Sequence, residues 1–158
     1  MIIDSSLEMA DNAALPLSSA VTVTNNLVIG GSIDLRPLIA DNATIDLSAG
    51  EPLYLVIEVT AIPAGTLDNY NFQAWTHTDS VAAGIAAAGT ELFRTGLISK
   101  TLLVAGRRWV VALPEADYER YFMVSGNANS GTVTSGNANI FITKDVTNWT
   151  STDTRVNV

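Results

Sequence analysis

The sequence predicts an all-β fold, an antiparallel sandwich or barrel, on the strength of two observations. Short runs of β-branched and aromatic residues follow one another at intervals of about ten residues, with turn residues between them. About nine to eleven such runs can be distinguished, which is typical of an antiparallel sandwich. In the strongest run, Leu53–Thr60, apolar residues alternate with a more polar set, so that one face suits a core.

The first half of the chain holds four expected strands. The β-branched run Thr22–Ile29 is expected to end at Gly30–Gly31, and a short run, Ile33–Leu35, follows it. Ile45–Leu47 is a second short run. Leu53–Thr60 is expected to stop before the proline and glycine of the segment 62–65, because proline lacks a ladder donor.

The second half is expected to hold six more strands and little helix. An alanine-rich stretch, Ser80–Gly89, is interrupted by Gly84 and is interpreted as a loop with at most one helical turn. Leu7–Ala14 is a second, weaker helical candidate. The expected strands are Tyr70–Thr76, Thr90–Thr95, Thr101–Val104, Arg108–Leu113, Arg120–Ser125 and Ile140–Thr143.

A glycine-rich segment, SGNANSGTVTSGNAN, occupies residues 125–139 and contains one pentapeptide twice. No helix follows its glycines, so a phosphate-binding loop is not indicated. Two copies are too few for a repeat architecture. Because expected strands flank the segment, it is interpreted as a β-hairpin with its turn at Asn129–Gly131, and as a candidate contact surface.

Composition limits the classes of partner. The chain has 158 residues, the size of one domain, and a formal net charge of −8. That sign opposes binding to nucleic acid and to anionic membrane surfaces, and no apolar window is long enough for a membrane span. A positively charged protein surface is a better complement. The absence of cysteine excludes disulfides and thiolate metal sites.

No catalytic or cofactor-binding constellation emerges from the sequence. The single histidine, His77, has no nucleophile elbow with which to form a triad. Glu115, Asp117 and Glu119 share one short loop, whereas glycosidases place two carboxylates across a cleft. The basic pair Arg107–Arg108 suits either a charged strand edge that resists aggregation or a contact with an acidic partner. We therefore expect no catalytic residue, no metal and no cofactor.

Several elements, in order, resemble the Bbp16-type capsid cement proteins of tailed bacteriophages. The resemblance covers about residues 1–143, while the second SGNAN copy and the Trp149-containing tail depart from it. Its elements are the opening MIIDSSLEMADNAAL, Asp34–Leu35, GEPLYLVIEV at 50–59, ELFRTG at 91–96, LVAGRRWVVALP at 103–114, ERYF at 119–122 and GTVTSG at 131–136.

This resemblance implies a jelly-roll-like β-sandwich that sits on the outside of the virion capsid, clamps adjacent major capsid proteins and self-associates as a dimer or trimer. Residues 1–143 would form the sandwich with its amino-terminal arm, and 144–158 a polar tail that a neighbouring subunit orders. The candidate partner-contact residues are Ile2, Ile3, Leu7, Arg107, Arg108, Trp149 and Val156.

Two other functions remain open. A carbohydrate- or receptor-binding module of a tail fibre or secreted enzyme would need an exposed aromatic platform, for which Tyr70, Trp75 and Trp109 are candidates. A hydrolase on the same fold would need acidic residues clustered in a cleft.

Overall fold

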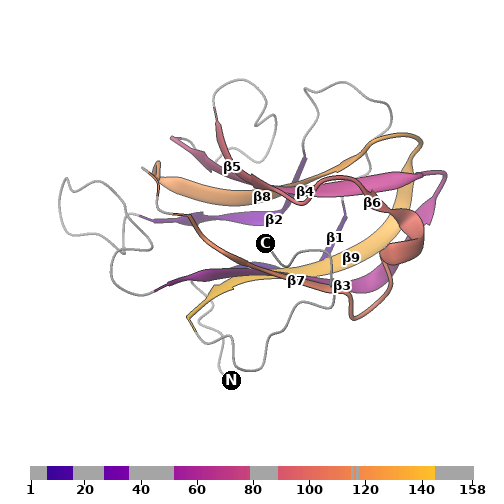
Figure 1. The fold of residues 1–158 in the computed structure, drawn as a ribbon, viewed down its shortest axis with the longest axis horizontal. Helices are drawn as coiled ribbons and strands as arrows, with labels where there is room; N and C mark the ends of the chain where they lie inside the picture. Colours follow the sequence, from indigo (N-terminus) through magenta and orange to yellow (C-terminus); the bar gives the residue numbers. More distant parts are fainter. Residues whose placement is uncertain are drawn as a thin grey trace.

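Two antiparallel sheets pack face to face in the computed structural model, which describes residues 7–15, 27–35, 52–78, 89–114, 116 and 118–144 (Figure 1). The described part is almost entirely β, with one short 3-10 helix, η4 (Lys100–Leu102). None of its helical structure is long enough to cross a membrane. The strands are β1 (Glu8–Ala14), β2 (Leu27–Asp34), β3 (Tyr54–Gly65), β4 (Asn69–His77), β5 (Thr90–Arg94), β6 (Ile98–Ser99), β7 (Arg108–Ala112), β8 (Tyr121–Ala128) and β9 (Val133–Thr143).

The strand order is that of a jelly roll. Sheet A runs β1-β9-β3-β7, and sheet B runs β2-β8-β4-β5, with the short β6 also paired to β4. Consecutive strands therefore alternate between the sheets through most of the chain, as two interleaved Greek keys require. The predicted all-β sandwich is confirmed, together with its jelly-roll character.

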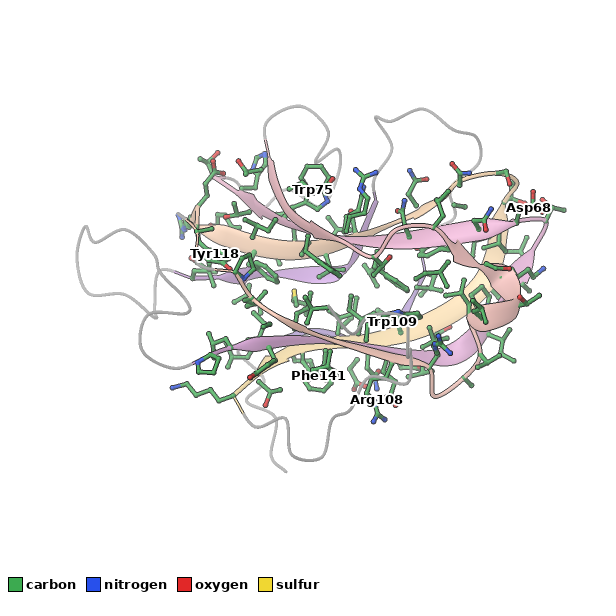
Figure 2. The ribbon with its side chains drawn as sticks, viewed as in Figure 1. Asp68, Trp75, Arg108, Trp109, Tyr118 and Phe141 are labelled. Atoms are coloured by element: carbon green, nitrogen blue, oxygen red, sulfur yellow. The ribbon has the colours of Figure 1, made fainter. Side chains whose placement is uncertain are left out.

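The core lies between the sheets and is centred on aromatic rings. Trp109 of β7 is 1% exposed and packs against Phe72 of β4, with 5.5 Å between ring centroids. Tyr70 completes the row at 5.2 Å from Phe72. In Figure 2, Trp109 lies between the sheets, whereas Trp75 and Phe141 lie on the two opposite outer faces. The apolar face predicted for β3 is buried as expected, through Leu53, Leu55, Ile57 and Val59.

Two predicted strand ends are wrong, because each strand continues past its glycine or proline residues through irregular strand pairing. β2 continues through Gly30–Gly31, where it advances four residues from Val28 to Ser32 while its partner β8 advances two. Such a bulge keeps the strand in the sheet. β3 continues to Gly65 past Pro63. Its pairing with β7 ends at Glu58, so that side of β3 needs no donor at Pro63.

Two other local predictions are also wrong. Leu7–Ala14 is not helical: its residues from Glu8 onward form β1, paired with β9. Thr101–Val104 is not a strand, since it overlaps η4 and the turn that follows. The pairing with β4 is made instead by β6, through Asn69 and Tyr70. The predictions for Ile45–Leu47, residues 22–26 and residues 80–88 lie outside the described residues.

The glycine-rich segment is not a hairpin. Its first arm lies in β8, paired with β2 and β4, and its second arm lies in β9, paired with β1 and β3. The segment therefore crosses from sheet B to sheet A. The residues 129–132 do form the connection, and this connection is tied to the one between β3 and β4 by a hydrogen bond from the Thr66 amide to the Thr132 carbonyl (3.0 Å).

A buried hydroxyl gives a test of this core. Tyr70 is fully buried and its Oη has no hydrogen-bond partner. Replacing Tyr70 with phenylalanine should raise the free energy of unfolding by about 1 kcal/mol, because an unpaired buried hydroxyl carries an uncompensated desolvation cost. Urea denaturation at pH 7 measures this change.

The same substitution should change the response to alkaline pH. Burial raises the pKa of the Tyr70 phenol above its ordinary value of 10.0. Above that pH the unfolded chain loses the proton while the folded chain retains it, so the free energy of unfolding of the wild type falls by about 1.4 kcal/mol per pH unit through this group. The advantage of the phenylalanine variant should therefore widen above about pH 10. An advantage that stays constant between pH 7 and pH 11 would contradict the buried, unpaired state of Tyr70.

Candidate partner-contact surface

The structure describes three of the seven predicted contact residues and does not bring them together. Leu7 directly precedes β1, at one edge of sheet A, and is half-buried against the core. Arg107 and Arg108 lie at the start of β7, the opposite edge of that sheet. Ile2, Ile3, Trp149 and Val156 lie outside the described residues.

Both arginines engage residues of their own chain. Arg108 Nη2 donates to Glu58 Oε1 of β3 at 2.6 Å, with side chains only 22% and 17% exposed. The Arg107 guanidinium lies 5.7 Å from the Trp109 ring centroid. These contacts fasten β7 to β3 and to the core. A role in contacting a partner stays a prediction.

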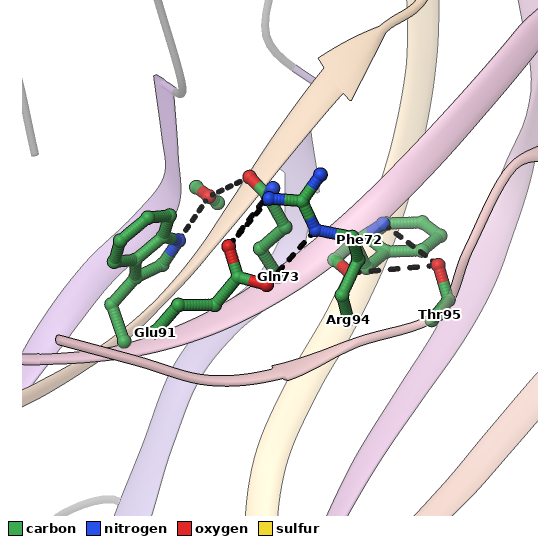
Figure 3. A network of polar contacts seen from close by, with 7 residues as sticks. Phe72, Gln73, Glu91, Arg94 and Thr95 are labelled. Carbon is green, nitrogen blue, oxygen red and sulfur yellow. Dashed lines mark hydrogen bonds and ion pairs between the residues drawn. The ribbon is translucent and has the colours of Figure 1, made fainter. Parts of the chain in front are cut away.

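A polar network lies on the outer face of sheet B, where its members are buried or half-buried apart from Arg94 (Figure 3). Trp75 Nε1 donates to Ser125 Oγ at 2.9 Å, and Ser125 Oγ donates to Gln73 Oε1 at 3.3 Å. Gln73 Nε2 then donates to Glu91 Oε2 at 3.4 Å. The chain of donors and acceptors is thus continuous from β8 through β4 to β5.

Arg94 closes this network on the β5 side. Its Nε and Nη2 donate to the two Glu91 carboxylate oxygens at 2.9 and 2.6 Å. Residues three apart in a regular strand face opposite ways, but the irregularity between Glu91 and Phe93 in their pairing with β4 puts Glu91 and Arg94 on one face. The Glu91 hydrogen bond raises the pKa of Arg94. Glu91 is the one carboxylate of this network, and Arg94 neutralises it, so the network does not provide a pair of groups for acid–base catalysis.

These two ion pairs can be compared by mutation. Replacing Arg108 with alanine should lower the free energy of unfolding by about 1–2 kcal/mol, because Glu58 is left mostly buried without its cation. Replacing Arg94 with alanine is the matched control, since its pair with Glu91 is more exposed (48% and 28%). That loss should stay below about 0.5 kcal/mol. Chemical denaturation of both variants checks the order, and equal losses would contradict it.

Candidate catalytic residues do not converge in the described part of the chain. His77 is half-buried at the end of β4, and no group of three metal-ligating side chains occurs among the described residues. Glu115 and Asp117 lie outside those residues. Tyr70 and Trp109 belong to the core and therefore cannot form an exposed sugar platform; Trp75 is half-buried.

Three exposed apolar side chains form the strongest candidate contact surface, here called the apolar end. Ile62, Leu97 and Val104 are 57%, 58% and 46% exposed and are the large exposed hydrophobic residues of the described chain. Ile62 lies near the end of β3, Leu97 precedes β6 and Val104 lies between η4 and β7. These segments gather at the end of the sandwich where β3 leads into β4 (Figure 1).

The apolar end carries few charged residues and is well fixed. In the segments 59–69 and 95–106 the charged residues are Lys100, whose Nζ donates to the Gly65 carbonyl at 2.6 Å, and Asp68 of the β3–β4 connection. Asp68 Oδ2 accepts a hydrogen bond from Ser130 Oγ at 2.8 Å. Depletion of charge is the compositional mark of an interface core, and a fixed surface loses little entropy on binding.

Sequence reasoning missed this surface. Ile62 falls in the segment expected to end a strand and Val104 in the expected strand Thr101–Val104, while Leu97 belongs to no expected element. Nothing local distinguishes an exposed aliphatic residue from a buried one. The available signal was the near absence of charge across 95–106 in a chain with net charge −8. That absence predicts a covered surface for those residues of the segment that stay outside the core, as Leu97 and Val104 do.

Comparison with known proteins places the chain in a family. No curated protein matches the chain. A sequence model of the Bbp16 family matches residues 17–142, which is most of the chain and includes β2 to β8 and nearly all of β9. The match agrees with the resemblance found in the sequence, and it indicates a phage-related structural protein associated with the virion. The chain belongs to the Bbp16 family.

Proposed function

We propose that this protein binds the outer surface of a bacteriophage capsid, clamps adjacent major capsid proteins and has no enzymatic activity. Membership of the Bbp16 family carries the proposal, because it points to a structural protein of the virion. The described side chains agree with it. The polar network on sheet B is hydrogen-bonded among its own members, and the large exposed hydrophobic side chains of the described residues lie at the apolar end.

The apolar end is proposed as the surface that meets the shell. Burying an exposed aliphatic side chain stabilises a complex by about 25 cal/mol for each Å² removed from water. Because the net charge is −8, most other surfaces of the protein favour a basic partner. The apolar end can bind a partner surface that carries no positive charge. A clamp that binds through apolar contact should also keep its affinity as salt is raised.

Co-sedimentation with empty capsids of the cognate phage tests the function and the surface separately. The wild-type protein is expected to sediment with the shells. Replacing Val104 with aspartate should weaken binding at least about tenfold, since a charge would then be buried in the contact. The matched control is Thr78→Asp, an exposed residue just beyond β4 at the opposite end of the sandwich.

The outcomes separate cleanly. A wild-type protein that stays in the supernatant at micromolar shell concentration overturns the capsid-binding function. A Val104→Asp variant that binds as well as the wild type leaves that function in place and removes the apolar end as its surface. Equal weakening by Thr78→Asp would show a general charge effect and would also remove the apolar end.

Self-association is the second part of the proposed function. We propose a dimer or trimer, because a clamp placed between neighbouring capsid proteins gains strength when several copies engage the shell together. Light scattering coupled to size exclusion measures the mass in solution. A mass of one chain at all concentrations would contradict this part alone.

A further inference from the structure

β7 forms an edge of sheet A and pairs on one side only. Its neighbour is β3, and no other strand of the described residues pairs with it. At the other end of the strand order the two sheets close on each other: β1 and β2 approach so closely that a Cβ on Gly30 would overlap the Met9 carbonyl. The edge of β7 lies away from this closed side.

β7 is also the regular one among the four terminal strands of the two sheets. The pairing of β1 with β9 is interrupted twice, and the pairing of β2 with β8 is interrupted around Gly30–Gly31. β5 has one irregularity in its pairing with β4. Such irregularities protect sheet edges against pairing with other chains. β7, in contrast, pairs with β3 without a break from Arg108 to Ala112.

The open side of β7 presents backbone groups that can pair with a further strand. Just beyond β7, the Leu113 amide donates to the Leu53 carbonyl at 2.8 Å. Backbone groups alternate in direction along an antiparallel strand, so the odd-numbered residues of β7 direct theirs toward β3 and the even-numbered residues direct theirs outward. Within the described chain, the outward groups of Val110 and Ala112 have no partner. Together they offer donors and acceptors to an added strand.

One core-facing side chain at this edge is left partly open. Val111 alternates with Trp109 and Leu113, which are 1% and 5% exposed, and it therefore has their direction. Val111 itself is only half-buried. A strand added to β7 would cover it, because side chains of neighbouring strands contact each other on a shared face.

We propose that the edge of β7 pairs with β7 of a second copy of this chain, antiparallel and about a two-fold axis at Val110. The inference rests on the self-association proposed above and names its surface. In this register each Val110 lies opposite the other, and Arg108 lies opposite Ala112 of the second copy. The outward backbone groups would exchange about six hydrogen bonds. Sheet A would continue from one copy into the other.

The sequence of β7 is complementary to itself in this register. Arg108 is the one charged residue of the strand, and the register keeps the two arginines at opposite ends of the contact. Arg108 is also paired with Glu58 of its own chain at 2.6 Å. Val56 is the cross-strand partner of Val110, so an apolar pair from each copy would meet at the axis. A contact of this symmetry closes at two copies, and the inference therefore selects the dimer.

Opposite charges at position 110 test both the surface and the axis. Val110→Lys and Val110→Glu each place two like charges opposite each other, and each should weaken dimerisation at least about tenfold at low salt. A one-to-one mixture of the two variants should form the dimer again, because opposite charges then face each other. Light scattering coupled to size exclusion, run over a concentration series, measures the mass.

The mixture also controls for folding, because a variant that fails to fold could not be rescued by mixing. Thr78→Lys and Thr78→Glu form the matched control pair, since Thr78 is exposed just beyond β4. Their mass should equal that of the wild type, separately and mixed.

Cross-linking gives a second readout, since the natural chain has no cysteine. Under oxidising conditions Val110→Cys should form a covalent dimer. Directly opposed residues of an antiparallel pair lie about 5.5 Å apart at Cα, within the range of a disulfide. Thr78→Cys is the matched control and should link far more slowly, although it is the more exposed position.

Four results would overturn the inference. A dimer that persists in both Val110 variants would leave self-association in place and assign it to another surface. Dissociation of both variants without recovery in the mixture would remove the axis at Val110, and a trimer would remove the two-fold contact. A wild-type chain that stays monomeric would overturn the self-association as well, and loss of shell binding in both variants would then assign the edge to a strand of the capsid protein. Co-sedimentation of the wild type decides capsid binding separately.

Discussion

Replacing Trp109 with alanine should lower the free energy of unfolding by about 3–5 kcal/mol, the cost of emptying a large aromatic site in a packed core. Trp109 is 1% exposed and packs between the sheets against Phe72 at a centroid distance of 5.5 Å. The Arg107 guanidinium also lies over its ring, 5.7 Å from the centroid. The cavity would open where β7 meets sheet B, so chemical denaturation should show an earlier midpoint with a similar slope.

The variant Trp109→Phe shows how much of the stability loss comes from the lost volume of the side chain, because it keeps an aromatic ring at this position. The indole Nε1 is buried without a hydrogen-bond partner, so removing it relieves a desolvation cost while the smaller ring leaves a smaller void. That variant should lose no more than about half of the alanine loss. If alanine costs less than about 1 kcal/mol, Trp109 does not lie in a packed core and the jelly-roll packing of β7 is wrong.

The strands with clear periodicity were predictable from the sequence because their pattern is local. In β3 and β4, alternate residues face the core, and the apolar residues at those positions mark the buried face without any knowledge of partners. The predicted apolar set of β3 is buried to the last member. The same reasoning placed β5, β7 and the first part of β8 close to their observed bounds.

Strand ends and sheet membership were not predictable, because both depend on partners distant in sequence. Gly30–Gly31 ends a strand by local propensity, but pairing with β8 on both sides carries β2 through them. The two arms of the glycine-rich segment resemble a hairpin, yet β8 and β9 each find other partners and separate into different sheets. A jelly roll rests on such distant pairings, and a local pattern is silent about them.

The candidate contact surface was less predictable still. Arg107 and Arg108 stand out in an acidic sequence, and the structure engages both with Trp109 and Glu58. The exposed Ile62, Leu97 and Val104 do not stand out, because exposure is decided by tertiary structure. Charge marks a residue in a sequence, whereas an interface core is marked by the absence of charge on a folded surface.

Gly126→Ala is expected to cost about 3 kcal/mol or to prevent folding, at the upper end of the range for overpacking. A Cβ at this position would overlap the Oη and ring of Tyr70, which is itself fully buried. Neither side can yield easily: Gly126 pairs with Phe72 and with Leu27 in the middle of sheet B, and Tyr70 is held by Phe72. Thermal and urea denaturation measure the loss.

Gly106→Ala is the matched control, because it separates backbone conformation from crowding. Gly106 has a φ of +81° with open space around it, so its replacement should cost only about 1 kcal/mol of left-handed strain. Gly126 has no such φ, and its requirement is purely steric. Adding Tyr70→Leu should therefore recover part of the Gly126→Ala loss and none of the Gly106→Ala loss. Equal losses at the two glycines would contradict this steric reason.

The three evenly spaced glycines Gly126, Gly131 and Gly136 then have three separate structural reasons. Gly126 leaves room for Tyr70, Gly131 forms a turn at φ +71°, and Gly136 allows close approach to Pro63.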